Sequence, residues 1–273
     1  MAALQDLFSY TFMLRALIVG ALVALCAALL GVSLVLKRYS MIGDGLSHVG
    51  FGALAVAMCL HWAPLPVAIP VVIASAFLLL RLSENSKLKG DSAIALIASS
   101  SLAFGVTVIS LSSGQSNDVY SYLFGSILTM TQSDVYLSVA LSVVVLTLFV
   151  LCYHKMFAVT FDESFAKATG IKANLYNMLL ALLTALTIVV GMRIMGTMLI
   201  SSLIIFPALS AMRLFRQFRT VVIAAAVISL CCFFTGLLTS YFLSTPTGAS
   251  IVLANLAAFL ICLLAGMLRK KSA

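Results

Sequence analysis

A carboxylate and an imidazole stand four residues apart in an apolar stretch that reads Met41-Ile-Gly-Asp-Gly-Leu-Ser-His48-Val-Gly-Phe-Gly52. On a helix, residues i and i+4 leave the same face, so Asp44 and His48 can share one ligand. A carboxylate and an imidazole together suit zinc, manganese or iron. The alternative interpretation is that Asp44 caps the helix N-terminus and His48 hydrogen-bonds to it. Spacing alone leaves both interpretations open.

Small residues flank this polar face. Gly45 and Gly52, with Ala53 and Ala57 nearby, form a stripe that allows a neighbouring helix to approach closely. An ionisable group near the centre of a bilayer costs at least ~2.5–3.5 kcal/mol, so such groups usually mark a site or a pathway. We therefore expect Asp44 and His48 to line a polar path beside a tightly packed neighbour.

A second group of polar residues lies in the segment from about 154 to 174. Thr160-Phe-Asp-Glu163 has the spacing of a capping box, which predicts a helix start at Thr160. Asp162 and Glu163 suit the positive end of a helix, Glu163 and Lys167 can pair at i,i+4, and Gly170 is a stop signal.

The predicted helix is about nine residues long and carries Phe161, Phe165 and Ala168 along one side. A helix this short is not stable alone in water. It must pack on the membrane surface, on its own bundle or on a partner protein, and the residues alone do not choose among these.

Composition determines what can position these groups. Of 273 residues, 63% are hydrophobic and 9% are charged, whereas soluble domains are about 45–50% apolar and about 25% charged. These values exclude a soluble enzyme, a disordered chain and a disulfide-stapled mini-protein. They predict an all-α polytopic membrane protein with one transmembrane domain over residues 1–273.

The sequence contains nine apolar runs near the length of about 20 residues that crosses a bilayer. Two junctions, His61–Ala63 and Arg193–Met195, are short enough for tight hairpins or broken helices, so eight to ten spans are possible. The runs are Phe12–Leu36, Met41–Leu60, Pro64–Leu82, Ser92–Ser112, Asp134–Tyr153, Leu175–Met192, Gly196–Met212, Thr220–Leu243 and Ala249–Leu268.

Basic residues predict the orientation. All but two of the 16 lysines and arginines lie in alternate connections, and the exceptions are Arg15 and Arg193. Because cytoplasmic loops are enriched in Lys and Arg, we expect the N-terminus outside and the C-terminus in the cytoplasm. The positive charge is divided among separate loops, which argues against a nucleic-acid partner. The acids Asp118 and Asp134 are expected to be solvated loop residues on the outer side.

The connections leave no room for a nucleotide-binding domain, and the chain contains no G-x-x-x-x-G-K-[ST] phosphate loop. ATP-driven transport would therefore need a separate ATPase chain. Two other classes remain as alternatives. A secondary transporter or channel would usually show inverted repeats, and an intramembrane enzyme would favour motifs such as H-E-x-x-H or G-x-S-x-G. None of these signs is evident.

Four segments together resemble the permeases of bacterial ABC importers for zinc and manganese, the ZnuB-like proteins. The match extends from about Gly31 to Gly266 with the motifs in the family's order. The segments are Gly43-Asp-Gly-Leu-Ser-His48 with Gly50 and Gly52, Tyr122-Leu-Phe-Gly-Ser-Ile-Leu128, Phe161–Gly170, and Val190-Gly-Met-Arg-Ile-Met-Gly196 continuing to Phe206-Pro-Ala208.

The resemblance implies a fold similar to the vitamin-B12-type importers and no catalytic residue of the chain's own. It implies a second copy of the permease, cytoplasmic ABC ATPase subunits and an extracytoplasmic metal-binding protein as partners, in a bacterial cytoplasmic (inner) membrane with its lipid. The family's pathway Asp and His match Asp44 and His48. Its coupling helix matches Asp162–Gly170, so the ATPase becomes the expected partner of Phe161 and Phe165, and Asp162, Glu163, Lys167 and Gly170 become expected coupling residues.

No permanently bound cofactor is expected. The metal is the transported ion, with zinc favoured and manganese or iron as alternatives. One carboxylate and one imidazole are too few for a closed zinc site, so a second chain, water or other side chains would complete a transient one.

Overall fold

The computed structural model describes residues 11–85, 90–111 and 132–271. Throughout these ranges the regular structure is helical, and nine of the helices are long and apolar enough to cross a membrane. This confirms the predicted fold class and the count of nine. The motif at Tyr122–Leu128, the acid Asp118 and the basic residues Lys87 and Lys89 lie outside the described residues.

The helices follow one another with short connections. They are α2 (Thr11–Leu36), α3 (Ile42–Cys59), α4 (Pro64–Asn85), α5 (Gly90–Leu111), α7 (Gln132–Phe161), α8 (Glu163–Ala168), α9 (Ala173–Met195), α10 (Thr197–Leu214), α11 (Phe218–Leu243) and α12 (Thr247–Lys271).

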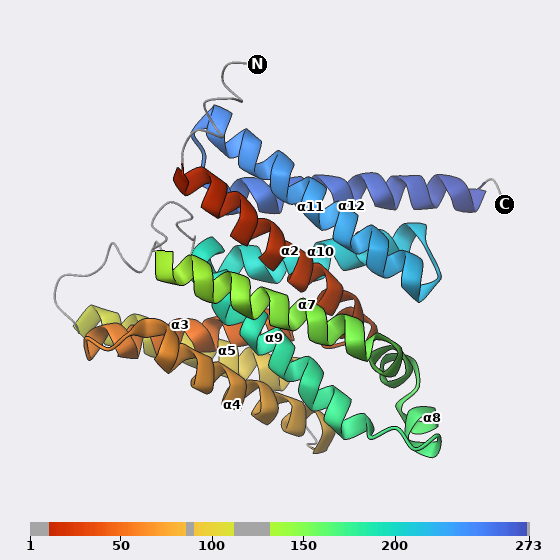
Figure 1. Cartoon of the computed structure of the whole chain (residues 1–273), viewed down its shortest axis with the longest axis horizontal. Helices are drawn as coiled ribbons and strands as arrows, with labels where there is room; N and C mark the ends of the chain where they lie inside the picture. The colour runs from red at the N-terminus through yellow and green to blue at the C-terminus, as the bar shows by residue number, and fades with distance from the viewer. Residues whose placement is uncertain (1–10, 86–89, 112–131, 272–273) are drawn as a thin grey trace.

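The long apolar runs form helices because a segment in hydrocarbon must satisfy its backbone hydrogen bonds internally. Both short junctions are reversals between separate helices. α3 and α4 are joined at Leu60–Ala63, where His61 has a φ of 55°, and α9 and α10 meet at Gly196, where φ is 86°. A positive φ of this kind favours glycine, and α10 runs back along the bundle from it (Figure 1).

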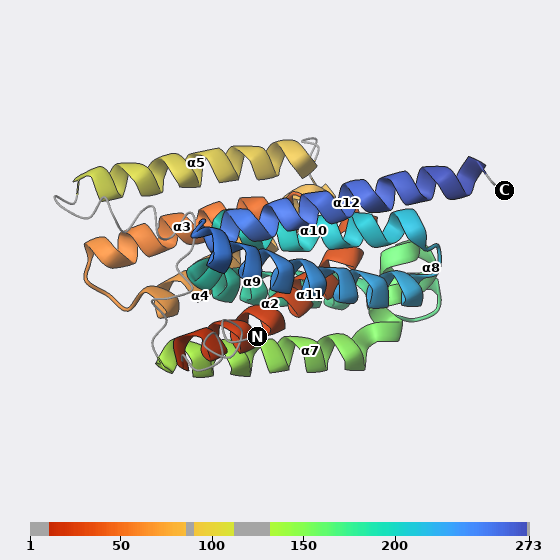
Figure 2. The ribbon, with the colours of Figure 1, turned by 90° about the horizontal axis from the view of Figure 1, so that it is seen from above.

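The core of the bundle is formed by α2, α3, α9 and α10, which have the larger buried shares among the spans. α2 packs against α7, α9, α10 and α11, and α3 packs against α4 and α5. Viewed from above, α5 and α7 lie at opposite faces with the core helices between them (Figure 2). Many large apolar side chains on the spans face outward, as expected for surfaces in lipid.

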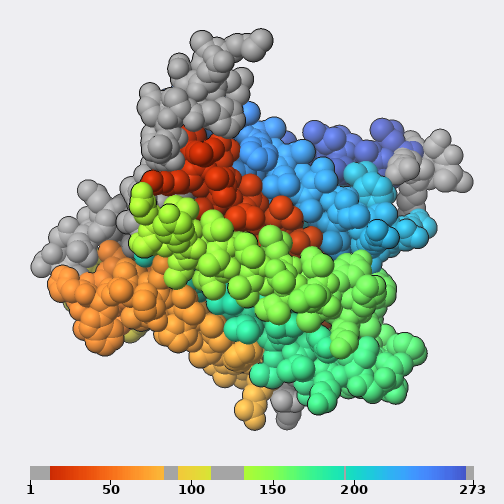
Figure 3. Space-filling view, in the orientation of Figure 1, coloured from red at the N-terminus to blue at the C-terminus, as the bar shows by residue number. Residues whose placement is uncertain are grey.

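The short helix α8 lies at one end of the bundle, together with the C-terminal end of α12 (Figure 1). We call this end the α8 end. In the space-filling view, α2 and α7 lie side by side, and the segment between α7 and α9 projects at one corner (Figure 3). Basic residues lie at this end in the loop after α2 (Lys37), in α8 itself (Lys167) and in the loop after α10 (Arg216).

Candidate functional site

The first candidate site lies on α3, near its start. Asp44 and His48 face the same side, with 3.7 Å between the Asp44 Oδ2 and His48 Nε2 atoms. This distance is too long for a hydrogen bond. The other carboxylate oxygen, Oδ1, accepts a long hydrogen bond of 3.4 Å from the hydroxyl of Ser201 on α10. Both contacts are loose, so the carboxylate has capacity for a further ligand.

The capping alternative is not what the structure shows. α3 begins at Ile42, its N-cap residue is Met41, and no side chain caps the helix. His48 is mostly buried, with a side chain that is 19% exposed. Its Nδ1 atom is buried and has no hydrogen-bond partner. Most buried polar atoms in proteins are satisfied, so this nitrogen is available to a water or a ligand.

The Asp44–His48 face opens into a cavity of about 470 Å³ between α3 and α5. The glycine stripe determines how close α5 comes: a Cβ at Gly45 would lie 2.6 Å from a side-chain carbon of Ile94, and one at Gly52 would lie 3.1 Å from the carbonyl oxygen of Ser101. The predicted close approach of a neighbouring helix is therefore confirmed. The cavity is lined by Met41, Asp44, His48, Ile94, Ala95, Ala98, Ser99 and Leu102.

The set of possible ligands is small. Among the described residues, no three or more His, Cys, Asp or Glu side chains gather where they could hold a metal ion. A carboxylate and a neutral imidazole can still bind a divalent transition metal if water or other groups complete the coordination. The geometry therefore suits transient binding more than a closed structural site.

The expectation that Asp134 is a solvated loop acid is wrong. Asp134 lies in the first turn of α7 and is 7% exposed. Its Oδ2 accepts a hydrogen bond of 2.9 Å from Nη2 of Arg193, near the end of α9. A buried carboxylate requires such a partner. The pair joins α7 and α9 at the end of the bundle opposite α8.

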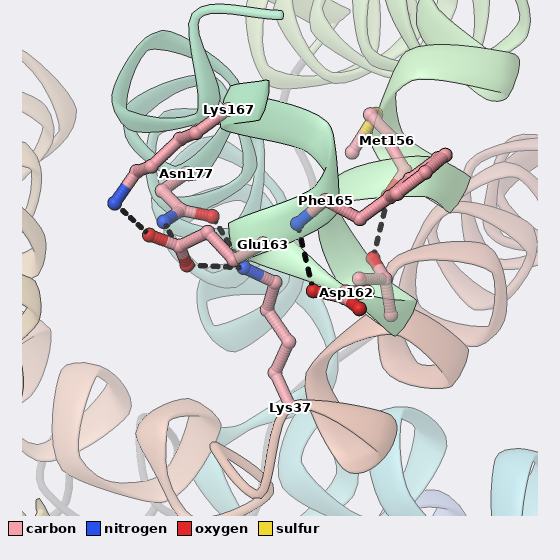
Figure 4. Close-up of polar contacts among 8 residues, drawn as sticks. Lys37, Met156, Asp162, Glu163, Phe165, Lys167 and Asn177 are labelled. Atoms are coloured by element: carbon pink, nitrogen blue, oxygen red, sulfur yellow. Dashed lines mark hydrogen bonds and ion pairs between the residues drawn. The ribbon is translucent and has the colours of Figure 1, made fainter. Parts of the chain in front are cut away.

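The second candidate site is α8, which spans Glu163–Ala168 and is shorter than the predicted nine residues. The predicted capping box is also wrong. α7 continues to Phe161, and the hydroxyl of Thr160 donates to the carbonyl of Met156 at 2.7 Å within α7. The N-cap is Asp162, whose Oδ1 accepts the amide hydrogen of Phe165 at 2.9 Å (Figure 4).

The two faces of α8 differ. Phe165 is 65% exposed, and Phe161, just before the helix, is 58% exposed. The buried residue of α8 is Ala166, which packs against Val159 and Ala173. Gly170 ends the segment as predicted, with a φ of 83° and open space around it.

Glu163 binds three side chains from three parts of the chain (Figure 4). Its Oε1 atom pairs with Lys167 at 2.7 Å, which confirms the predicted i,i+4 pair. Its Oε2 atom accepts from the amide of Asn177 on α9 at 3.0 Å and lies 3.6 Å from the ammonium of Lys37. These hydrogen bonds, that of Lys167 above all, and the Lys37 charge hold the pKa of Glu163 below its usual value although partial burial acts in the opposite direction.

Lys37 completes the cluster by donating a hydrogen bond to the side-chain oxygen of Asn177. The Lys37 side chain is 9% exposed and Asn177 is 3% exposed. In the sequence, Lys37 is one of the basic residues that indicate orientation, and Asn177 was not predicted to belong to a site. A polar side chain near the start of the apolar run Leu175–Met192 was the available clue.

Comparisons with known proteins agree with this architecture. The model of the family described as ABC 3 transport family matches residues 9–266. The manganese import system permease protein ScaB of Streptococcus gordonii is 29% identical over 258 residues, which cover 94% of this chain and 92% of that protein. The high-affinity zinc uptake system membrane protein ZnuB of Haemophilus influenzae is 29% identical, covering 93% of this chain and 97% of that protein.

Two solved structures share the fold. PsaBC from Streptococcus pneumoniae, in complex with a Fab, has a TM-score of 0.85 and 29% identity, and the match covers 96% of this chain and 95% of that one. An inward-facing metal-chelate type ABC transporter has a TM-score of 0.70 at 17% identity, covering 97% of this chain and 89% of that one. The second likeness concerns the fold alone.

Proposed function

The chain belongs to the ABC 3 transport family, and on that premise we propose that it is the membrane-spanning subunit of an ATP-driven importer that moves a divalent transition metal into the cytoplasm. Relatives are named for manganese and for zinc. Zinc is our first candidate, and manganese or iron would be carried by the same chemistry.

The observation that carries the proposal is the Asp44–His48 face. Its carboxylate is held only by long contacts, its imidazole has an unsatisfied buried nitrogen, and both groups line the cavity between α3 and α5. A transported ion must be bound well enough to enter and loosely enough to leave. Two protein ligands per chain, completed by water or by a second copy of the permease, meet both needs.

The distribution of basic residues supports a cytoplasmic α8 end. The N-terminus would then lie outside, where an extracytoplasmic metal-binding protein delivers the ion, and the C-terminus would lie in the cytoplasm. At the α8 end, the exposed rings of Phe161 and Phe165 form the surface that would dock into an ABC ATPase. Short helices with exposed aromatic anchors suit a groove on a partner.

ATP binding and hydrolysis in the partner would move α8 and expose the Asp44–His48 site alternately to the two sides of the membrane. The permease would supply no catalytic residue and hold no permanent cofactor. The metal would be substrate, bound for the time that one conformational cycle takes.

The test is metal uptake into proteoliposomes containing this chain with and without its ATPase, with zinc, manganese and iron(II) in competition. We expect uptake only when both ATPase and ATP are present. Asp44→Ala and His48→Ala should reduce uptake to background while the complex still assembles.

A matched control comes from the same cavity wall. Ser99 lines the cavity, and its hydroxyl donates within its own helix to Ala95 at 2.8 Å. Ser99→Ala should therefore leave uptake unchanged. Normal uptake by both the Asp44 and the His48 variants would refute the site, and equal uptake without the ATPase would favour a secondary transporter.

A further inference from the structure

The helix proposed to receive force from the ATPase is weakly packed on its own bundle. Of the six residues of α8, Ala166 is the buried one. A single alanine against Val159 and Ala173 provides little apolar contact area. The backbone joins α8 to α7 through Asp162 and to α9 through residues 169–172, so a load on α8 would need a further attachment to reach α2.

The attachments are polar and converge on Glu163. One attachment leads to α9 through Asn177, and another leads to Lys37, directly after the last residue of α2 (Figure 4). Lys37 reaches both Glu163 and Asn177 with a side chain that is 9% exposed. A buried ammonium is retained only where it is paired and hydrogen-bonded. The position of the Lys37 ammonium therefore depends on where α8 holds Glu163.

From α2, rigid contacts continue toward the candidate metal site. A Cβ at Gly31 would lie 2.1 Å from the carbonyl oxygen of Ile204 on α10, so the two backbones touch at this point. Ser201 stands one turn before Ile204 on the same helix, and its hydroxyl is the group that contacts Asp44. Closely packed interiors transmit displacement instead of absorbing it.

We propose that Lys37 is a positioning residue that ties α8 to α2, so that movement of α8 reaches Asp44 through α2 and α10. This inference rests on the proposed function, because it assumes that an ATPase moves α8. Lys37 contacts neither the ion nor the ATPase in this mechanism. Loss of the Lys37 ammonium would leave ATP hydrolysis intact and lower the amount of metal transported per ATP.

The experiment measures the number of metal ions moved per ATP hydrolysed, using zinc and manganese as probes and the full complex in proteoliposomes. We expect Lys37→Gln to lower this ratio at least about tenfold while ATP hydrolysis continues. Lys37→Arg, which keeps a cation with several donors, should retain most of the ratio. Arg38→Gln removes the adjacent exposed cation and should leave the ratio unchanged.

A double variant shows whether Lys37 acts through Glu163. If the two residues work through one contact, Lys37→Gln with Glu163→Gln should lower the ratio no further than Lys37→Gln alone. If the Lys37→Gln complex fails to assemble, Glu163→Gln becomes the deciding variant for the metal-to-ATP ratio. Its side-chain oxygen can still accept from Asn177, while the charge that pairs with Lys37 is lost.

An unchanged ratio in the deciding variant would overturn the inference, including the case in which hydrolysis and uptake fall in proportion. This result can occur while the wild-type complex shows ATP-dependent uptake, and the proposed function would then stand. Absence of ATP-dependent uptake by the wild-type complex would instead refute the proposed function itself.

Discussion

Two polar regions of this membrane protein differ in how well their groups are satisfied. At the α8 end, Glu163 has contacts of 2.7 Å, 3.0 Å and 3.6 Å with three different side chains. On α3, the contacts of Asp44 are 3.4 Å and 3.7 Å, and one nitrogen of His48 is buried without a partner. Both regions combine acid and base in an apolar chain.

The difference distinguishes a structural polar cluster from a binding site. A structural cluster gains rigidity when each of its polar groups has a partner, because an unpaired group in a low-dielectric interior is costly. A site for a transient ion must keep lone pairs available for that ion. Substitutions in the first region should therefore change stability or coupling, and substitutions in the second should change transport with little effect on stability.

The largest effect on stability should come from a second satisfied pair, Asp134–Arg193. Arg193→Met removes the guanidinium beside a carboxylate that is 7% exposed. We expect a loss of about 3 kcal/mol in the free energy of unfolding, since removing one partner of a buried ion pair is strongly destabilising. The measurement is thermal unfolding in detergent. Adding Asp134→Asn to this variant should recover at least half of the loss, and no recovery would contradict the explanation.

Loss of Lys37 should loosen α8 locally. Lys37→Met keeps an apolar stem but deprives the 3% exposed Asn177 and the Glu163 carboxylate of the ammonium. We expect the local opening free energy of α8 to fall by about 1–2 kcal/mol. Amide hydrogen exchange over residues 163–170 measures this opening. Equal exchange in both proteins would show that the cluster does not hold the helix.

Acid should lower the local opening free energy of α8 by a smaller amount. The folded-state pKa of Glu163 is lowered, so its contribution is complete above the unfolded value of about 4.3 and is lost as the pH falls through the lower folded value. The side chain is 35% exposed, so we expect an effect below about 1 kcal/mol. Protection of α8 in the wild type should decrease as the pH falls below the unfolded value, and Glu163→Gln should reduce this dependence.

The smallest effect on stability should accompany a large effect on transport. His48→Leu keeps a similar volume and removes a buried nitrogen that has no partner. We expect the free energy of unfolding to stay within about 1 kcal/mol of the wild type, while metal uptake falls to background. A strongly destabilised His48→Leu protein would mean that the imidazole belongs to the packing of α3, and the contrast between the two regions would disappear.

Local sequence pattern was enough to predict the helices and the shared face of Asp44 and His48. Nine apolar runs become nine helices among the described residues because hydrocarbon leaves each segment no other way to satisfy its backbone. Asp44 and His48 share a face because helical geometry relates residues i and i+4. The Glu163–Lys167 pair followed from the same spacing.

The capping box shows how a local pattern can fail. Thr160 and Glu163 had the right spacing, but α7 did not stop before Thr160, so its hydroxyl bonded within α7 and Asp162 became the cap. Residues 160 and 161 extend α7 instead of starting the next helix. The point at which α7 ends depends on its packing against other helices, and the residues of the segment alone do not reveal that packing.

By itself, the sequence determined the class of molecule, the nine apolar runs and the spacing that places a carboxylate beside an imidazole, because these depend on composition and on short-range geometry. Only the tertiary structure decided which groups are satisfied. Asp134 meets Arg193 across 59 residues and Lys37 meets Asn177 across 140. Those pairings follow from how the helices pack, and packing brings together residues whose sequence separation carries no sign of their contact.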